Sequence, residues 1–353
     1  MGFTFGPVLL FNRRDHATGN KRGHRKNVDL GQGSDNCRVA SAWPWGGAPM
    51  KVLVTGGLGF IGVNLASYLR SEGSVSEISA VDWLEESTPA ERAPFDHVSE
   101  GCFASREGLV MAEKADVVVH LAAQCSVQDS IADPAGTFFE NVGKTETLLE
   151  HLRTNTPATR LIFASTAAVA GDHDGPISEA TPPAPLSPYG ASKLAVEGLL
   201  SAYRGSFGMK NVALRFSNVY GPNARRQGGV IPSFCRQLLA DNRMTVNGDG
   251  EQTRDYIYVD DISAAISAVI RREAEGCYQL GTGVATSVLQ LAGILADLAP
   301  SNAPRIEHAE ALPGEVRHNC ADITKAQAEL GFEPQFDVKE GVARTFRWFE
   351  DMA

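Results

Sequence analysis

Short apolar runs alternate with helix-like stretches along the chain from residue 50 onward. The runs are rich in Val, Ile and Leu, and the segments between them place apolar residues at helical spacing. This alternation is typical of a parallel sheet that is covered by helices on both faces. We therefore expect an α/β fold in which residues 50–220, with a return segment near 255–275, form a doubly wound parallel sheet.

The pattern changes after Gly221-Pro222. The elements become shorter, Gly, Asp and Pro become more frequent, and no repeat is visible. We expect residues 221–254 and 276–350 to form a second, smaller C-terminal α/β domain.

The first 49 residues differ in composition from the rest of the chain. They carry seven Lys and Arg side chains against three acids, with scattered glycines and no sustained periodicity. Such a segment is predicted to be a disordered extension, because it cannot bury enough apolar surface to fold. Its apolar piece at 8–11 is too short for a signal-peptide core, and the basic residues follow it. Since Met50 directly precedes the first predicted strand, an upstream start codon or an added extension explains this segment at least as well as a functional arm.

A glycine-rich turn follows the first predicted strand. Residues 51–62 contain a β-branched apolar run, then Gly56, Gly59 and Gly62 at intervals of three, then the start of a helix. The first glycine allows a tight turn, the second lets the backbone approach a pyrophosphate, and the third lets the helix pack on the strand. Phosphates then meet the positive end of the helix. This context predicts a Rossmann dinucleotide site. The expected contacts are Gly56, Gly59, Phe60, Ile61 and Gly62.

A carboxylate ends the next predicted strand. Asp82 closes the run 78–82, about 20 residues past the last glycine. It can accept hydrogen bonds from both ribose hydroxyls and would repel a 2′-phosphate. The expected cofactor is therefore NAD rather than NADP.

A tyrosine and a lysine lie one helical turn apart in the segment Pro-Tyr-Gly-Ala-Ser-Lys at 188–193. A free phenol, with a pKa of about 10, is no base at neutral pH, but a fixed cation nearby favours the phenolate. Lowering the pKa of Tyr189 by roughly three units takes about 4 kcal/mol. Lys193 alone falls short of this, so a second positive charge is needed, and an oxidised nicotinamide ring would supply it.

Two further predicted strands end in small or hydroxyl residues. Residues 117–123 end in Leu121, Ala122 and Ala123, and small residues at the end of a strand let a cofactor contact the backbone. Residues 160–166 end in Thr166. Ligands of such sheets bind at the carboxyl ends of the strands. We therefore expect Thr166, Tyr189 and Asn218 to lie near one another.

Composition limits the classes of function. The chain has 353 residues, is 43% hydrophobic and 21% charged, and carries a formal charge of −10. This composition is typical of a soluble globular protein, and the negative charge argues against a nucleic-acid surface. No apolar run approaches the roughly 18 residues of a membrane span. The six cysteines show neither a CxxC motif nor metal-ligand spacing, so we expect a cytoplasmic protein without a metal site.

Taken together, the motifs resemble those of a known family. Thr-Gly-Gly-Leu-Gly-Phe-Ile-Gly, His-Leu-Ala-Ala, Ser-Thr, Tyr-x-x-x-Lys and Gly-Asp-Gly-Glu-Gln-Thr-Arg-Asp occur in the order found in the extended short-chain dehydrogenase/reductase family, and most resemble its NAD-dependent nucleotide-sugar epimerases and dehydratases. The resemblance runs from Lys51 to Trp348. It implies a Rossmann domain that binds NAD, a C-terminal domain that closes on a nucleoside-diphosphate sugar, and a homodimer.

The resemblance also implies roles for individual residues. Tyr189 is the expected catalytic base, Lys193 its partner that also holds the nicotinamide ribose, and Thr166 the hydroxyl that bridges to the substrate, with Ser165 as its substitute. A strand-end cap is the alternative for Thr166, and a solvated helix face is the alternative for Lys193. The expected substrate-binding residues are Ser126, Thr166, Asn218, Val246, Arg254, Glu315, Arg317 and Asn319.

Some of the substrate contacts leave alternatives. Arg254 and Asn218 resemble the residues that hold the diphosphate, and a salt bridge to Asp255 or Asp260 is the alternative for Arg254. Glu315 would accept from the nucleoside ribose. Arg317 either reaches a phosphate or lies on the surface.

The residues after Thr166 bear on the reaction. Relatives that eliminate water or lose a carboxylate have an acid there, whereas this chain has Ala167 and Ala168. Without that acid, simple return of the hydride remains. The expected reaction is 4-epimerisation of a UDP-sugar of the UDP-glucose or UDP-N-acetylglucosamine type through a 4-keto intermediate. The alternatives are a UDP-glucuronate 4-epimerase or another nucleotide-sugar oxidoreductase of the family, and a non-catalytic NAD-binding scaffold.

Four positions bear on specificity or depart from the family pattern. Asn319 occupies the place of the gate for sugar size, where its short side chain leaves room for an N-acetyl group on carbon 2. Ala170 replaces a tyrosine beside the sugar. Cys102 occupies the place of the acid that holds adenine, which would weaken cofactor affinity. His120 is expected to be a hydrogen-bonded core histidine rather than a catalytic one.

Overall fold

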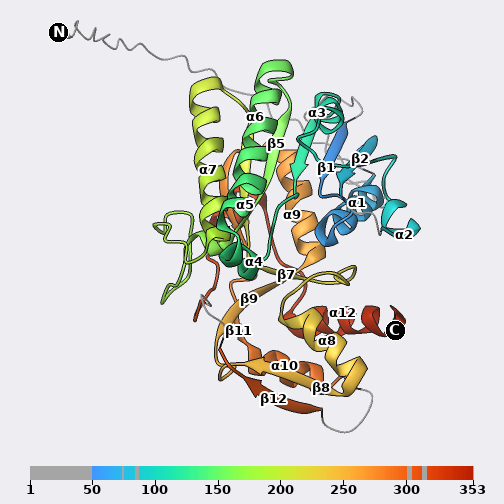
Figure 1. Ribbon diagram of the computed structural model, residues 1–353, viewed down its shortest axis with the longest axis vertical. Helices are drawn as coiled ribbons and strands as arrows, with labels where there is room; N and C mark the ends of the chain where they lie inside the picture. Colours follow the sequence, from blue (N-terminus) through green and yellow to red (C-terminus); the bar gives the residue numbers. More distant parts are fainter. Residues whose placement is uncertain (1–49, 74, 84–86, 300–303, 312–315, 353) are drawn as a thin grey trace, which may run out of the picture. The chain divides into compact units, whose positions relative to one another are not determined.

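A seven-stranded parallel sheet forms the centre of the larger part of the protein (Figure 1). The computed structural model describes residues 50–352 except 74, 84–86, 300–303 and 312–315. The strands follow the spatial order β10-β6-β5-β4-β1-β2-β3, and every neighbouring pair is parallel. Their bounds are β1 (Lys51–Thr55), β2 (Glu77–Asp82), β3 (His97–Glu100), β4 (Val117–His120), β5 (Arg160–Thr166), β6 (Asn211–Phe216) and β10 (Gly276–Leu280).

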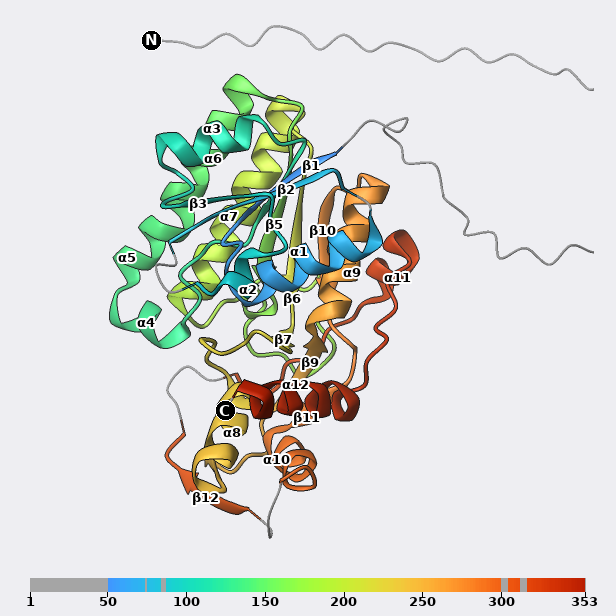
Figure 2. The ribbon, with the colours of Figure 1, turned by 90° about the vertical axis from the view of Figure 1, so that its right-hand side faces the viewer.

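Helices cover both faces of this sheet (Figure 2). On one face, α1 (Phe60–Glu72) packs on α9 (Val259–Arg272), with α11 (Thr324–Leu330) beside them. The other face carries α3 (Arg106–Glu113), α6 (Lys144–Asn155) and α7 (Pro188–Phe207). This arrangement confirms the doubly wound α/β fold.

The buried strands explain why the apolar runs are continuous. In β1, Val52 and Val54 enter the core under α1 and α9, while Leu53 enters the core under α3 and α6. Successive side chains of a strand point to opposite faces, so a strand covered on both sides needs apolar residues at every position.

The order of the strands reverses between β1 and β4. β1 pairs with β2 on one side and with β4 on the other. The connections after β1 and after β4 therefore diverge at the carboxyl ends of the strands, which opens a crevice where ligands bind in such folds. The connection after β4 contains the short helices α4 (Val127–Ala132) and α5 (Pro134–Phe138) and a π-helical turn at Phe139–Gly143, while the short helix α2 (Pro89–Arg92) lies between β2 and β3.

The remaining elements form a smaller part with its own core. β7 (Asn218–Tyr220), β9 (Thr253–Tyr258) and β11 (Ala285–Ser287) make a three-stranded sheet, and β8 (Arg243–Asn247) pairs with β12 (Arg305–Ala309). The helices α8 (Val230–Asp241), α10 (Val288–Ala296) and α12 (Val338–Met352) pack around a core that includes Tyr220, Phe234 and Phe346. The domain boundaries drawn from the sequence stay a prediction. Within the described residues, no helix is both long and apolar enough to cross a membrane.

Candidate active site

The glycine turn lies tightly against the end of β4. Gly56 has a φ of +69°, and a Cβ atom there would lie 2.8 Å from the backbone nitrogen of Ala122. At Gly62 a Cβ atom would lie 2.4 Å from the carbonyl oxygen of Gly57. The two glycines therefore allow the turn to contact the Leu121–Ala122 backbone and allow α1 to begin directly on the turn.

The start of α1 is open to an anion. Gly59 is the N-cap residue and offers no side chain to accept from the first N–H groups of the helix. Phe60 and Ile61 follow in the first turn and are half-buried. Unsatisfied N–H groups at the positive end of a helix bind phosphate groups readily.

Asp82 lies beside this turn at the end of β2. Its Oδ2 accepts from the backbone N–H of Leu58 at 2.9 Å, and its Oδ1 accepts from that of Trp83 at 2.7 Å. Burial raises the pKa of this carboxyl, and the backbone hydrogen bonds oppose that rise. The carboxylate is thus held next to the glycine turn.

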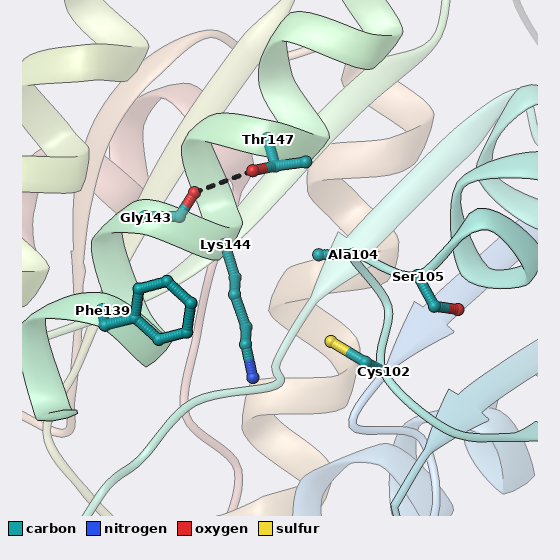
Figure 3. A pocket seen from close by; sticks show the side chains of 7 residues that line it. All are labelled: Cys102, Ala104, Ser105, Phe139, Gly143, Lys144 and Thr147. Atoms are coloured by element: carbon teal, nitrogen blue, oxygen red, sulfur yellow. Dashed lines mark hydrogen bonds between the residues drawn. The ribbon is translucent and has the colours of Figure 1, made fainter.

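A cavity of about 330 Å³ is lined by residues that follow β3 and by residues of the π-helical turn and the start of α6 (Figure 3). Gly101 donates its N–H to the Asp82 carbonyl at 2.7 Å, so the residues after β3 stay close to Asp82. Lys144 extends between Phe139 and Cys102 in this cavity, and its Nζ lies 5.7 Å from the ring centre of Trp83. The lining residues are Cys102, Ala104, Ser105, Phe139, Gly143, Lys144 and Thr147.

Thr166, Tyr189 and Lys193 come together at the ends of β5 and α7. Ser187 caps α7 by accepting from the Gly190 N–H at 3.1 Å, and this fixes the first turn, which carries Tyr189. The side chains of Thr166 and Tyr189 are hydrogen-bonded. The ammonium of Lys193 lies 6.0 Å from the ring centre of Tyr189.

Lys193 is not on a solvated helix face. It is 3% exposed, and its Nζ donates to the carbonyl oxygen of Ala164 at 2.8 Å. Thr166 does act as a cap as well, since its Oγ1 accepts from the Ala168 N–H at 3.1 Å. The alternative given for Thr166 therefore coexists with its contact to Tyr189.

The pKa of Tyr189 is raised, whereas the sequence predicted that nearby positive charge would lower it. Burial raises the pKa of the phenol above its ordinary value, although the hydrogen bond with Thr166 lowers it. Burial also lowers the pKa of Lys193 to about 8. Desolvation thus works against the charged form of each group, because each charged form loses water. The need for a second cation stays a prediction.

Ser165 cannot substitute for Thr166 in this arrangement. It lies on the other side of β5, where its hydroxyl donates to Glu197 Oε1 at 2.5 Å. Glu197 in turn accepts from Arg215 Nε at 2.9 Å and Nη2 at 2.7 Å. This buried ion pair was not anticipated. Its signals in the sequence are a glutamate one turn after Lys193 and an arginine inside a buried strand.

Asn141 is a second residue that the sequence did not indicate. It lies in the π-helical turn and is 2% exposed. Its Oδ1 accepts from the Gln124 N–H at 2.8 Å, and its Nδ2 donates to the Gln124 carbonyl at 2.9 Å and to Ser192 Oγ at 3.0 Å. It therefore fixes the segment after β4 against α7.

His120 is a core residue, as expected. Its Nδ1 lies 2.6 Å from Thr55 Oγ1, its Nε2 lies 2.9 Å from Thr145 Oγ1, and it has no exposed surface. Burial lowers its pKa to about 3, so it stays neutral. Within the described part of the chain, no group of His, Cys, Asp or Glu side chains is arranged to hold a metal ion.

Several predicted substrate residues lie at the junction with the smaller part. Asn218 begins β7, and its Nδ2 lies 3.4 Å from the Asp255 carbonyl oxygen. Arg254 Nη1 donates to the Thr253 carbonyl at 2.9 Å. The Asp255 carboxylate accepts from Thr282 and Gly283 in the turn after β10 and from the N–H of Ala321.

Asn319 is next to these residues. It is 6% exposed, and its N–H donates to the Thr253 carbonyl at 3.2 Å. Its Oδ1 has no hydrogen-bond partner among the described residues. A buried amide oxygen in this condition can accept a hydrogen bond from a ligand.

The other predicted substrate residues are placed less favourably. Arg317 forms a two-pronged pair with Asp249, at 2.8 and 3.0 Å, on an exposed surface. Ser126 uses its Oγ to cap α4 by accepting from the Asp129 N–H at 3.1 Å. Val246 is fully buried in the core of the smaller part, so the predicted contact is not open to its side chain. Glu315 lies outside the described residues.

Comparison with known proteins agrees with this geometry. Residues 52–281 match the model of the NAD dependent epimerase/dehydratase family. The chain is 33% identical to the UDP-glucose 4-epimerase of Mycolicibacterium smegmatis, over 86% of this chain and 99% of that protein.

Solved structures give the same result. The UDP-glucose 4-epimerase of Thermotoga maritima with UDP-glucose has a TM-score of 0.79 and 31% identity, over 86% of this chain and 99% of that one. The UDP-glucuronic acid 4-epimerase of Bacillus cereus with UDP-glucuronic acid and NAD has a TM-score of 0.78 and 29% identity, over 86% of this chain and 100% of that one.

Proposed function

Because the chain belongs to the NAD-dependent epimerase/dehydratase family, we propose that this enzyme inverts carbon 4 of a UDP-hexose and accepts UDP-N-acetylglucosamine as well as UDP-glucose. The observation that carries the proposal is the group Thr166, Tyr189 and Lys193, followed by a 3₁₀ turn that has Ala167 and Ala168 where an eliminating enzyme needs an acid.

The cofactor of this family, NAD, fits the residues of the crevice. The glycine turn leaves room for a pyrophosphate at the open end of α1, and Asp82 stands where a ribose would follow. The cavity lined by Cys102 and Lys144 would follow this ribose position, and it suits the adenine base. When bound, NAD would supply the acceptor and donor of the hydride at carbon 4, and its oxidised ring would place a positive charge in the site.

The side chains of this enzyme manage the proton. Tyr189 as phenolate takes the proton from the 4-hydroxyl group and gives it back after the hydride returns. Thr166, hydrogen-bonded to Tyr189, holds the substrate oxygen in line with the phenol. Lys193 stabilises the phenolate from the buried side, where water cannot screen its charge.

The choice of sugar rests on Asn319. Its side chain is short, buried and has an oxygen without a partner in the described part, which suits the N–H of an acetamido group on carbon 2. Asn218 and Arg254 lie at the junction of the two parts, where a diphosphate linking nucleoside and sugar would pass.

One incubation tests the proposal. The purified enzyme is mixed with UDP-glucose, UDP-N-acetylglucosamine or UDP-glucuronate without added NAD, and the 4-epimers are separated by chromatography. We expect the 4-epimers of the first two sugars without net NADH. Turnover of UDP-glucuronate alone, or NADH accumulation, supports the alternative oxidoreductases. No turnover of any sugar contradicts the proposal.

We also propose that the enzyme is a cytoplasmic homodimer. The outer side of α7 carries a row of small exposed residues, Ala191, Gly198, Ala202 and Gly205, which lets a second helix approach closely. Light scattering coupled to size-exclusion chromatography gives the mass in solution. A monomer at micromolar concentration contradicts this.

A further inference from the structure

The loop at residues 221–229, between β7 and α8, is bonded to the start of α1. Asn64, in the second turn of α1, donates its Nδ2 to the Pro222 carbonyl at 3.0 Å and to the Phe60 carbonyl at 2.7 Å. The side chain of Asn223 donates back to Asn64 Oδ1 at 3.2 Å. One end of the loop is therefore fixed to the helix turn that offers its N–H groups to the pyrophosphate.

The same loop is bonded to the segment that follows Asp82. Arg225 Nε and Nη2 donate to the two carboxylate oxygens of Glu91 at 2.9 and 3.1 Å, and Arg226 Nη2 donates to Oε2 at 3.3 Å. Glu91 lies in α2 and its side chain is only 8% exposed. Its Oε2 also accepts from the Thr88 N–H at 2.8 Å.

The smaller part of the protein also forms hydrogen bonds to this loop. Arg236 of α8 donates to the carbonyl oxygens of Arg225 and Gln227 at 3.3 and 3.2 Å. The loop thus joins three bodies: the phosphate-binding helix start, the segment after the ribose carboxylate, and the substrate side.

We propose that residues 221–229 form a strap that slows the release of NAD, with Glu91 as its anchor. The inference rests on the proposed function, in which the hydride returns in every cycle and no cofactor exchange is needed. While the strap is bonded, the glycine turn and the segment after Asp82 stay fixed relative to each other, so the site remains preorganised for the dinucleotide. Affinity gained by fixing a site appears mostly as slower dissociation.

The proposed strap depends most on the carboxylate of Glu91. Charge-assisted hydrogen bonds from arginine forks are stronger than neutral ones. The carboxylate is buried while both arginines are about one third exposed. Neutralising Glu91 therefore removes the attraction of both guanidinium groups at once and preserves the shape of the side chain.

The experiment measures exchange of bound NAD. Enzyme loaded with NAD is freed of unbound cofactor and mixed with an excess of isotope-labelled NAD, and the label on the protein is followed with time. We expect exchange to be roughly tenfold faster in Glu91→Gln and in Arg225→Gln, which corresponds to about 1.4 kcal/mol. High salt should accelerate exchange in the unmodified enzyme, since the arginines are partly exposed, and should do so less in Glu91→Gln.

Two controls separate the strap from other effects. Thr88→Ala removes the hydroxyl that caps α2 through the Glu91 N–H but keeps the carboxylate and its arginines. Glu340→Gln breaks an exposed pair with Arg344 on α12. We expect neither to change the exchange rate by more than about twofold, as surface pairs contribute little.

Each outcome either supports or overturns the proposed strap. Unchanged exchange in folded Glu91→Gln and Arg225→Gln overturns the proposal, and so does equal acceleration in Thr88→Ala. If Glu91→Gln does not fold, Arg225→Gln and the salt dependence of the unmodified enzyme still decide. A protein that exchanges NAD as expected but converts no nucleotide sugar would refute the proposed function and leave the strap intact.

Discussion

Tyr189 is the proposed catalytic base, and its surroundings shift its pKa in opposite directions. Burial raises the pKa of the phenol, while its hydrogen bond with Thr166 lowers it. Lys193 is buried beside it and keeps a proton at neutral pH, because its pKa is about 8. We therefore expect the phenolate to form when more positive charge enters the site.

The pH dependence of activity follows from these two groups. We expect turnover to rise with pH as Tyr189 loses its proton in the loaded enzyme and to fall at higher pH as Lys193 becomes neutral, since the phenolate then loses its partner. Ultraviolet difference spectra should show that Tyr189 titrates at lower pH with NAD than without it. An identical titration in both states would contradict the role of the second charge.

Removing the phenol oxygen tests the base directly. Tyr189→Phe should lower kcat by about 10²–10⁴-fold, the usual contribution of a general base, with NAD binding retained. Steady-state kinetics and a cofactor titration measure the two effects. Full turnover in this variant would refute the proposed mechanism.

The size of residue 319 should decide between sugars. Asn319→Tyr fills the space next to Thr253 with a ring, so the epimerisation of UDP-N-acetylglucosamine should fall at least about tenfold relative to that of UDP-glucose, because small pockets reject added bulk by a few kcal/mol at most. The ratio of the two kcat/KM values is the readout. An unchanged ratio would remove Asn319 from the sugar site.

At the scale of elements, helix α7 is tied to the sheet by the buried group of Ser165, Glu197 and Arg215. The side chains of Glu197 and Arg215 are 10% and 7% exposed. Ser165 precedes Thr166 on β5, and Glu197 follows Lys193 by one turn, so this group fixes the register between the strand and the helix that carry the proposed catalytic residues.

Breaking this group should destabilise the fold. Glu197→Ala leaves the Arg215 guanidinium buried without its carboxylate, and such a loss typically lowers the free energy of unfolding by about 3–5 kcal/mol. Urea unfolding measures it. Glu340→Ala, which removes an exposed pair on α12, is the matched control, with an expected change below about 1 kcal/mol.

At the scale of the whole molecule, the features that the sequence predicted are local ones. The glycine turn, the carboxylate after β2 and the pair Tyr189 and Lys193 are each defined within one strand, turn or helix, so spacing alone indicated them. The parallel arrangement of the strands followed from the alternation of apolar runs and helix-like stretches, because parallel strands need helical crossovers.

The features that the sequence did not predict depend on residues far apart in the chain. Glu91 meets Arg225 across 134 positions, and Asn141 meets Ser192 across 51. No periodicity links such residues, so only the fold shows them. For Ser126 and Val246, which stay predictions, the fold shows another use of the side chain: Ser126 caps α4 and Val246 is buried in the core of the smaller part.

The path of the chain has a consequence for anyone who wishes to dissect this enzyme. The last strand of the large sheet, β10, and the helix α9 come from residues beyond 258, after the chain has already built part of the smaller half. A truncated protein that ends near residue 220 would leave β6 as an edge strand. It would also expose the apolar face of β5 and β6. We expect such a truncated protein to precipitate rather than bind NAD by itself, because part of the larger sheet and its covering helix would be missing.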